Sequence, residues 1–183
     1  VKSLQEVGAH ALNTYPGTWR LEGGAKTKGN IIDEEYKEGI YVGYRWADKE
    51  KQRPVFAFGH GLSYTQFAIS KLRADKTTMT ATDSITFTVQ VKNIGQRAGS
   101  ETVQLYVHDV KASVDRPLKE LKGFCKVSLQ PGESKDVSIT LGKDALSFYD
   151  EATAAWKAEV GQFEAWVGNA SDNLKLKKTF ELK

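Results

Sequence analysis

The residues most open to a chemical role are one histidine between two glycines and a group of carboxylates before it. His60 stands between Gly59 and Gly61 in the run FAFGHGLSYTQF, residues 56–67. An imidazole there could act as a general base or a metal ligand. No Ser, Cys or second His is arranged around it as in a catalytic triad or a metal site. The spacing therefore favours a tight turn in which the imidazole bonds to local backbone.

The carboxylates are Asp33, Glu34, Glu35 and Glu38. Two carboxyl groups about 5 Å apart, one with a raised pKa, can cleave a glycosidic bond. Four acidic residues within six positions are more typical of a solvated turn or a helix start. Glu38, which leads into an aromatic segment, is the exception and a candidate for burial.

Metal and disulfide chemistry find little support in the sequence. Cys125 is the single cysteine, and His10, His60 and His108 are far apart with no ligand spacing between them. An internal disulfide is excluded, and a zinc cluster would need more thiols or clustered histidines. We expect no metal, no cofactor and no catalytic residue in this chain.

Aromatic side chains are frequent in the first third of the chain and could stack on sugar rings, although packing between domains is the favoured interpretation. They are Tyr15, Trp19, Tyr36, Tyr41, Tyr44 and Trp46. Further along, we expect Trp156 and Trp166 to pack in or beside a core.

Two polar motifs lie near the later strands. Asp115-Arg116 and Lys119-Glu120 are expected to be charged loop residues whose ion pairs contribute little. Asn169-Ala170-Ser171 matches an N-glycosylation acceptor, which matters only in a eukaryotic secretory route.

Composition places the chain among globular proteins and argues against two partner classes. Of 183 residues, 40% are hydrophobic and 27% are charged, with 26 basic and 23 acidic residues and a formal net charge of +3. This balance gives no footprint for nucleic acid. No apolar run approaches the roughly 20 residues that span a bilayer. The chain begins VKSLQEVG with Met79 as its only methionine, so we expect a piece of a longer protein.

The elements that carry these residues differ between the two parts of the chain. Four runs after residue 65 alternate apolar and polar side chains, and turn signals such as Pro131-Gly132 separate them. The four runs are DSITFTVQVKN, SETVQLYVHD, SKDVSITLG and GQFEAWVGN. About seven strands over about 115 residues, without a cysteine pair across the sheets, predict an antiparallel sandwich of the immunoglobulin or fibronectin type III type. Residues 144–151 are expected to cross from one sheet to the other.

The first part lacks the material for a core of its own. Residues 14–30 contain one proline and four glycines and are expected to form a loop, whereas residues 38–46 are β-branched and aromatic and predict a strand covered on both faces. We expect residues 1–64 to form one unit and residues 65–183 to form the sandwich. The overall class is mainly β.

The residues also resemble a known family. The runs YKEGIYVGYR, residues 36–45, and FGHGLSYTQF, residues 58–67, are similar to the C-terminal region of glycoside hydrolase family 3, the β-glucosidase and β-xylosidase family. Residues 91–135 and the runs LSFYDE and GQFEAWVGNAS resemble its fibronectin type III-like domain. Ala57 and Ala47 depart from the family pattern.

The resemblance implies that the catalytic aspartate and the acid/base glutamate precede this piece, in a barrel and in an α/β sandwich domain. Residues 1–64 would be the last segment of that α/β domain, and residues 58–64 would be the junction into the fibronectin-like domain. The expected partners are the rest of the parent enzyme and its glycoside substrate, and the expected compartment is the periplasm or the exterior, with the cytoplasm as an alternative. The competing hypothesis is an independent module that binds carbohydrate or protein, with Trp166 and Tyr106 as its test positions.

Overall fold

A computed structural model describes residues 18–20, 31–33 and 36–183, with side chains from residue 36 onward. The chain divides into two compact units, Val1–Phe56 and Ala57–Lys183. Each unit is described by itself.

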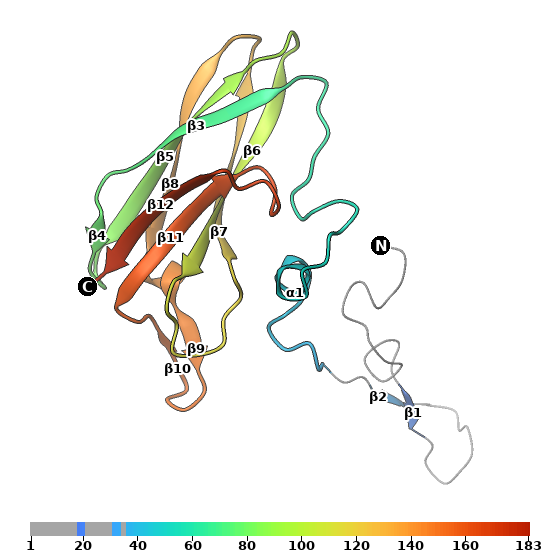
Figure 1. Ribbon diagram of the computed structural model, residues 1–183, viewed down its shortest axis with the longest axis vertical. Coiled ribbons are helices and arrows are strands. Elements are labelled where there is room, and N and C mark those ends of the chain that lie inside the picture. Colours follow the sequence, from blue (N-terminus) through green and yellow to red (C-terminus); the bar gives the residue numbers. More distant parts are fainter. Residues whose placement is uncertain (1–17, 21–30, 34–35) are drawn as a thin grey trace. The chain divides into compact units, whose positions relative to one another are not determined.

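The second unit is a sandwich of two antiparallel sheets (Figure 1). The larger sheet has the order β4-β12-β11-β6-β7, in which only the pair of β4 and β12 is parallel, and the smaller has the order β3-β5-β8. The strands of the two sheets are β3 (Phe67–Ala74), β4 (Thr78–Met79), β5 (Ser84–Asn93), β6 (Gly99–Asp109), β7 (Glu120–Leu129), β8 (Ser134–Gly142), β11 (Gly161–Gly168) and β12 (Leu176–Leu182). The four alternating runs of the sequence form β5, β6, β8 and β11, so the predicted β-sandwich is confirmed.

The core lies between the two sheets, as the alternating patterns predicted. On β5, Ile85, Phe87, Val89 and Val91 are all buried. The ring of Phe87 meets the ring of Phe180 on β12 edge to face, with centroids 5.3 Å apart. This contact joins the two sheets directly, because β5 and β12 belong to different ones.

The outer face of the smaller sheet is polar. Hydroxyl pairs span it between β5 and β8, with Thr86 Oγ1 2.9 Å from Thr140 Oγ1 and Thr88 Oγ1 2.8 Å from Ser138 Oγ. Such a face presents hydroxyl groups rather than aromatic rings to a partner.

Two further features modify the sheets. The edge strand β3 changes register between Ser70 and Arg73, and Lys71 within this bulge has a φ of 57°. The chain leaves β8 through the short 3-10 helix η2 (Lys143–Leu146) and a hairpin of β9 (Phe148–Asp150) and β10 (Ala155–Lys157), and then enters β11 of the other sheet. The predicted crossing at residues 144–151 is therefore confirmed.

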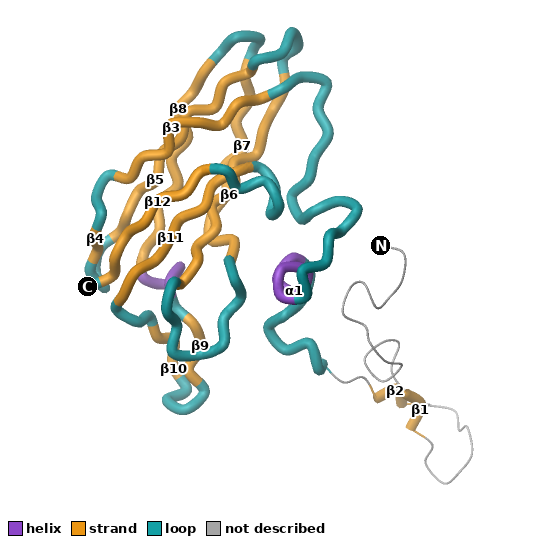
Figure 2. Tube along the Cα trace, in the orientation of Figure 1, coloured by secondary structure: helices purple, strands orange, loops and turns teal. Residues whose placement is uncertain are grey.

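The first unit contains the short strands β1 (Thr18–Arg20) and β2 (Ile31–Asp33) and the helix α1 (Tyr44–Lys49), which Figure 2 shows in purple. The predicted strand over residues 38–46 is wrong. Gly39 and Gly43 have φ values of 56° and 59°, a left-handed conformation that ends extended structure. A turn from Glu38 to Tyr41 is followed by helical bonding, with the Ala47 amide donating to the Gly43 carbonyl at 3.1 Å.

Across the described part of the chain, no helix is long and apolar enough to cross a bilayer.

Candidate functional site

The histidine run forms a strap, defined here as residues 57–66, which leads into β3 (Figure 1). The strap begins with a turn in which the His60 amide donates to the Ala57 carbonyl at 2.9 Å. Gly59 in this turn has a φ of 83°, as the turn prediction required. His60 itself is exposed on the strap.

The first anchor of the strap is a backbone hydrogen bond to the loop after β11, next to neutral polar side chains on β6. The Ser171 amide donates to the Phe58 carbonyl at 2.8 Å. A Cβ on Gly59 would lie 2.1 Å from Gln104 Nε2, so only glycine lets the strap approach this side chain. Gln104 is buried and donates through Nε2 to the Asn169 carbonyl at 2.7 Å, while it accepts the Tyr106 hydroxyl at 2.7 Å.

The second anchor is Asn93, which is fully buried at the end of β5. Its Oδ1 accepts the Thr65 hydroxyl at 2.7 Å and the Gly95 amide at 3.0 Å. Its Nδ2 donates to the carbonyls of Arg97 at 2.7 Å and Leu129 at 3.2 Å. Every hydrogen-bonding position of this side chain is used, so Asn93 fixes both the turn from Asn93 to Gly95 and the end of the strap.

Between its anchors the strap presents apolar groups to solvent. Leu62 and Tyr64 are each 92% exposed. Large exposed apolar side chains that lie close together are typical of a surface that binds another protein domain.

The strap anchors were not found by sequence reasoning. Gln104 and Tyr106 alternate with Val103, Leu105 and Val107, so their pattern places them on the outward face of β6. They are nevertheless buried. The only local signal was Asn93, whose position two residues before Gly95 is typical of a turn in which an Asn side chain accepts the amide of residue i+2.

Of the four candidate carboxylates, the structure describes the side chain of Glu38 alone. Glu38 is half-buried in the first unit, and the side chains of Asp33, Glu34 and Glu35 lie outside the described residues. No group of three or more His, Cys, Asp or Glu side chains that could hold a metal occurs among the residues that the structure describes.

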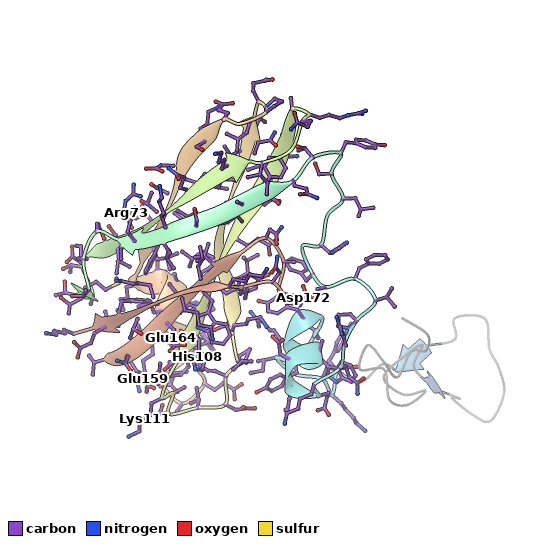
Figure 3. The ribbon with its side chains drawn as sticks, turned by 45° about the horizontal axis from the view of Figure 1, so that its top comes forward. Arg73, His108, Lys111, Glu159, Glu164 and Asp172 are labelled. Atoms are coloured by element: carbon purple, nitrogen blue, oxygen red, sulfur yellow. The ribbon has the colours of Figure 1, made fainter. Side chains whose placement is uncertain are left out.

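Cys125 and His108 both pack against other parts of the sandwich. Cys125 is partly buried against the sandwich core. His108 lies on β6, where Nδ1 is 2.7 Å from the Leu118 carbonyl oxygen, and its ring is 5.4 Å from that of Trp166. Figure 3 shows His108 and Glu164 close together, as their direct pairing on β6 and β11 requires. His10 is outside the described residues.

The aromatic residues of the first part have mixed surroundings. Trp46 is buried, Tyr41 and Tyr44 are half-buried, and Tyr36 is 85% exposed. The Lys49 ammonium lies 3.6 Å from the centroid of the Tyr41 ring. The side chains of Tyr15 and Trp19 lie outside the described residues.

Arg116 is a charged loop residue with ion pairs, as predicted, but the pairs are buried and lie within the sandwich rather than at a neighbouring surface. Its side chain is 8% exposed and lies 3.1 Å from Asp109 and 2.5 Å from Glu120. The guanidinium also donates to the Leu146 carbonyl at 3.0 Å and lies over the Phe148 ring. Arg116 thus ties the β6–β7 loop to η2 and β9 as a buried hub, which sequence spacing could not reveal.

Lys119 is a second buried charge in this loop. This residue is only 4% exposed at the end of the β6–β7 loop. Together with Arg116 it shows that the loop is held closely against the protein.

The glycosylation motif lies in a folded, hydrogen-bonded loop. Asn169 Nδ2 donates to Glu101 at 3.0 Å, and Asn169 Oδ1 accepts from Asn173 at 2.7 Å. Ser171 is buried. The motif therefore serves the first anchor of the strap.

The tryptophan expectations need correction as well. Trp156 is 69% exposed on β10, not packed in the core. Trp166 is half-buried on the outer side of β11, where the Lys177 ammonium lies 3.6 Å from its ring centroid. Tyr106 is fully buried. Neither test position of the binding-module hypothesis therefore presents a freely exposed ring: Trp166 is covered by Lys177, and Tyr106 is buried.

Comparisons with known proteins agree with this architecture. Residues 101–171 match the fibronectin type III-like domain family. The chain is 50% identical over 145 residues to thermostable β-glucosidase B of Acetivibrio thermocellus, and 47% identical over 153 residues to β-glucosidase BoGH3A of Bacteroides ovatus. These matches cover 79% and 84% of the chain but only 19% and 20% of the relatives. The chain is therefore similar to the C-terminal portion of glycoside hydrolase family 3 enzymes.

Solved β-glucosidase structures share the fold of this portion. DesR, a β-glucosidase from Streptomyces venezuelae in complex with D-glucose, superposes with a TM-score of 0.80 at 36% identity, over 95% of this chain and 20% of its own. The Bifidobacterium adolescentis GH3 β-glucosidase gives 0.78 at 34% identity, over 92% and 23%. The chain spans about one fifth of the length of its relatives, as a C-terminal portion with the fibronectin type III-like domain.

Proposed function

We propose that this chain is the non-catalytic C-terminal portion of a family 3 β-glucosidase. The relatives it matches are β-glucosidases, and it spans only about a fifth of them. The parent enzyme would hydrolyse terminal β-glycosidic bonds with two carboxylates that lie outside this chain and without a cofactor. Its compartment would be the periplasm or the cell exterior.

The sandwich would act as a brace for the catalytic domains. Residues 1–64 would complete the α/β sandwich domain of the parent. The observation that carries this proposal is the strap, which is anchored to the sandwich at both ends and exposes Leu62 and Tyr64 between its anchors. Covering these side chains fits an interdomain contact of roughly 600–1,500 Å². Hydrophobic burial there would hold the domains in register.

The inertness of the chain is directly testable. The 183-residue chain should give no turnover of an aryl β-glucoside or an aryl β-xyloside. Turnover that disappears in Glu35→Gln or Glu38→Gln would contradict the proposal, because it would place the catalytic carboxyls in this piece.

The bracing role is tested in the longer enzyme. Leu62→Asp and Tyr64→Asp should lower the thermal midpoint of the parent, whereas the isolated chain should keep its own midpoint, because both positions are solvent-exposed there. Phe124→Asp is the matched control, since Phe124 is 69% exposed on β7 and lies outside the strap. Equal effects of the three substitutions in the parent would argue against a specific docking role of the strap.

A further inference from the structure

An exposed aromatic pair of the sandwich lies on the β9–β10 hairpin. Tyr149 and Trp156 are direct cross-strand partners, 50% and 69% exposed. Their ring centroids are 5.7 Å apart and their planes meet at 75°. The two rings therefore form a corner in which one ring face can support a ligand while the other flanks it.

The hairpin that carries the pair is held rigidly at its turn and at its base. In the turn, Asp150 accepts the Ala152 amide at 3.1 Å and the Thr153 hydroxyl at 2.9 Å. At the base of β9, the Arg116 guanidinium bonds to the Leu146 carbonyl and lies over Phe148.

The base of β10 is fixed by a second set of contacts. Glu159 accepts the Ser113 hydroxyl at 2.6 Å and the Ser113 amide at 3.0 Å, and pairs with Lys157 at 3.2 Å. Figure 3 shows Glu159 beside Lys111, at the end of the sandwich where the β6–β7 loop turns. A preformed aromatic surface loses little conformational entropy when a ligand binds.

The surroundings of the pair define the class of ligand. Asp150 and Lys157 already have partners within the protein, so they do not select a charged ligand. Aromatic side chains cover 150–250 Å² each when fully buried, so the exposed part of this pair offers on the order of 250 Å². A stable protein partner usually covers about 800 Å². The exposed surface matches instead one or two pyranose rings, whose C–H faces are apolar and whose hydroxyls bond to neighbouring polar groups.

We propose that Tyr149 and Trp156 form a surface site for neutral β-linked glucose oligosaccharides. The choice of glucose rests on the proposed function, since the parent would act on β-glucosides. The site would keep an oligosaccharide near the enzyme without cleaving it.

Calorimetry on the 183-residue chain tests the site with cellohexaose, laminarihexaose and maltohexaose as probes. We expect millimolar binding of at least one β-linked probe and weaker binding of the α-linked maltohexaose. Trp156→Ala should weaken binding about tenfold or more, because exposed tryptophans dominate such contacts, and Trp156→Phe should recover part of the loss. Phe124→Ala removes an aromatic ring of equal exposure, 69%, and should leave binding unchanged.

Three results would overturn the site. They are no binding of any probe, equal binding by Trp156→Ala at an unchanged unfolding midpoint, and a change in sedimentation of the chain with Trp156→Ala, which would assign the pair to a protein contact. None of them bears on hydrolysis, because the proposed function fails only if the chain turns over an aryl glycoside or if the strap substitutions do not act on the parent.

Discussion

The strap and the β6–β7 loop are both attached to the sandwich by buried polar contacts, but with different chemistry. The strap is held by neutral groups, chiefly the Asn93 side chain, which accepts the Thr65 hydroxyl, and the Ser171 amide, which donates to the Phe58 carbonyl. The β6–β7 loop is held by charged groups, chiefly Arg116 and Glu159. A lost amide leaves neutral groups unpaired, whereas a lost guanidinium leaves buried carboxylates unpaired, which is more unfavourable.

The largest loss of stability is expected from Arg116→Ala. Asp109 and Glu120 would lose their shared cation at side-chain exposures of 6% and 13%. The free energy of unfolding should fall by about 3 kcal/mol, at the lower end for a broken buried pair because Lys122 lies 3.6 Å from Glu120. Urea denaturation of the 183-residue chain measures this change.

Arg73→Ala is the matched control for Arg116→Ala. Arg73 pairs with Asp136 at 2.7 Å, but their side chains are 56% and 49% exposed. Its removal should cost less than about 1 kcal/mol. Equal losses for the two arginines would mean that burial does not distinguish the hub from a surface pair.

An intermediate effect is expected from Asn93→Ala. This change removes the side-chain amide that donates to the Leu129 and Arg97 carbonyls. It also removes the oxygen that accepts the Thr65 hydroxyl. The free energy of unfolding should fall by about 2 kcal/mol. Hydrogen exchange should also accelerate at Gly95 and Ile94, next to the strap, before the rest of the sandwich. Uniform acceleration would contradict a local anchoring role.

The smallest loss of stability is expected from Ser113→Ala, and it depends on pH. The Ser113 hydroxyl and amide hold the pKa of Glu159 below its ordinary value of 4.5, with Lys157 adding to the effect. This carboxylate therefore stabilises the folded state above about pH 4.5, and the stabilisation is lost as the pH falls through the lowered pKa. Ser113→Ala should reduce stability at pH 7 by less than about 1 kcal/mol.

The pH dependence of stability separates the contacts of the β6–β7 loop from those of the strap. The difference between Ser113→Ala and the wild-type chain should shrink below pH 4.5, because the protonated Glu159 no longer benefits from Ser113. The pKa of Glu133 is also lowered, by the Gln130 amide and Lys135, and affects both proteins equally. A difference that grows in acid would contradict the role of Glu159. The effect of Asn93→Ala should not depend on this titration.

The fold of the sandwich was predictable because its pattern is local. From Ser84 to Lys92 on β5, each inward residue is apolar and each outward residue is polar, and a strand of period two has only one register that buries the apolar set. The turns at Asn93 and Pro131 carry residues that favour them. For these elements the sequence contains the information within a few positions.

The rest depends on contacts that a linear pattern does not show. Residues 38–46 have the composition of a strand, but the left-handed backbone at Gly39 and Gly43 converts them into a turn and a helix. Arg116 is buried because Asp109, Glu120 and the Leu146 carbonyl converge on it from three segments. Trp156 is exposed because its hairpin extends beyond both sheets.

The irregularity in β3 has a consequence for solubility. An outermost strand offers unused backbone donors and acceptors to neighbouring molecules, which can add strands and grow into fibres. The left-handed Lys71 breaks that row after Ser70 and places a cation in the middle of it. A strand of another molecule therefore cannot form an uninterrupted row of backbone hydrogen bonds along β3.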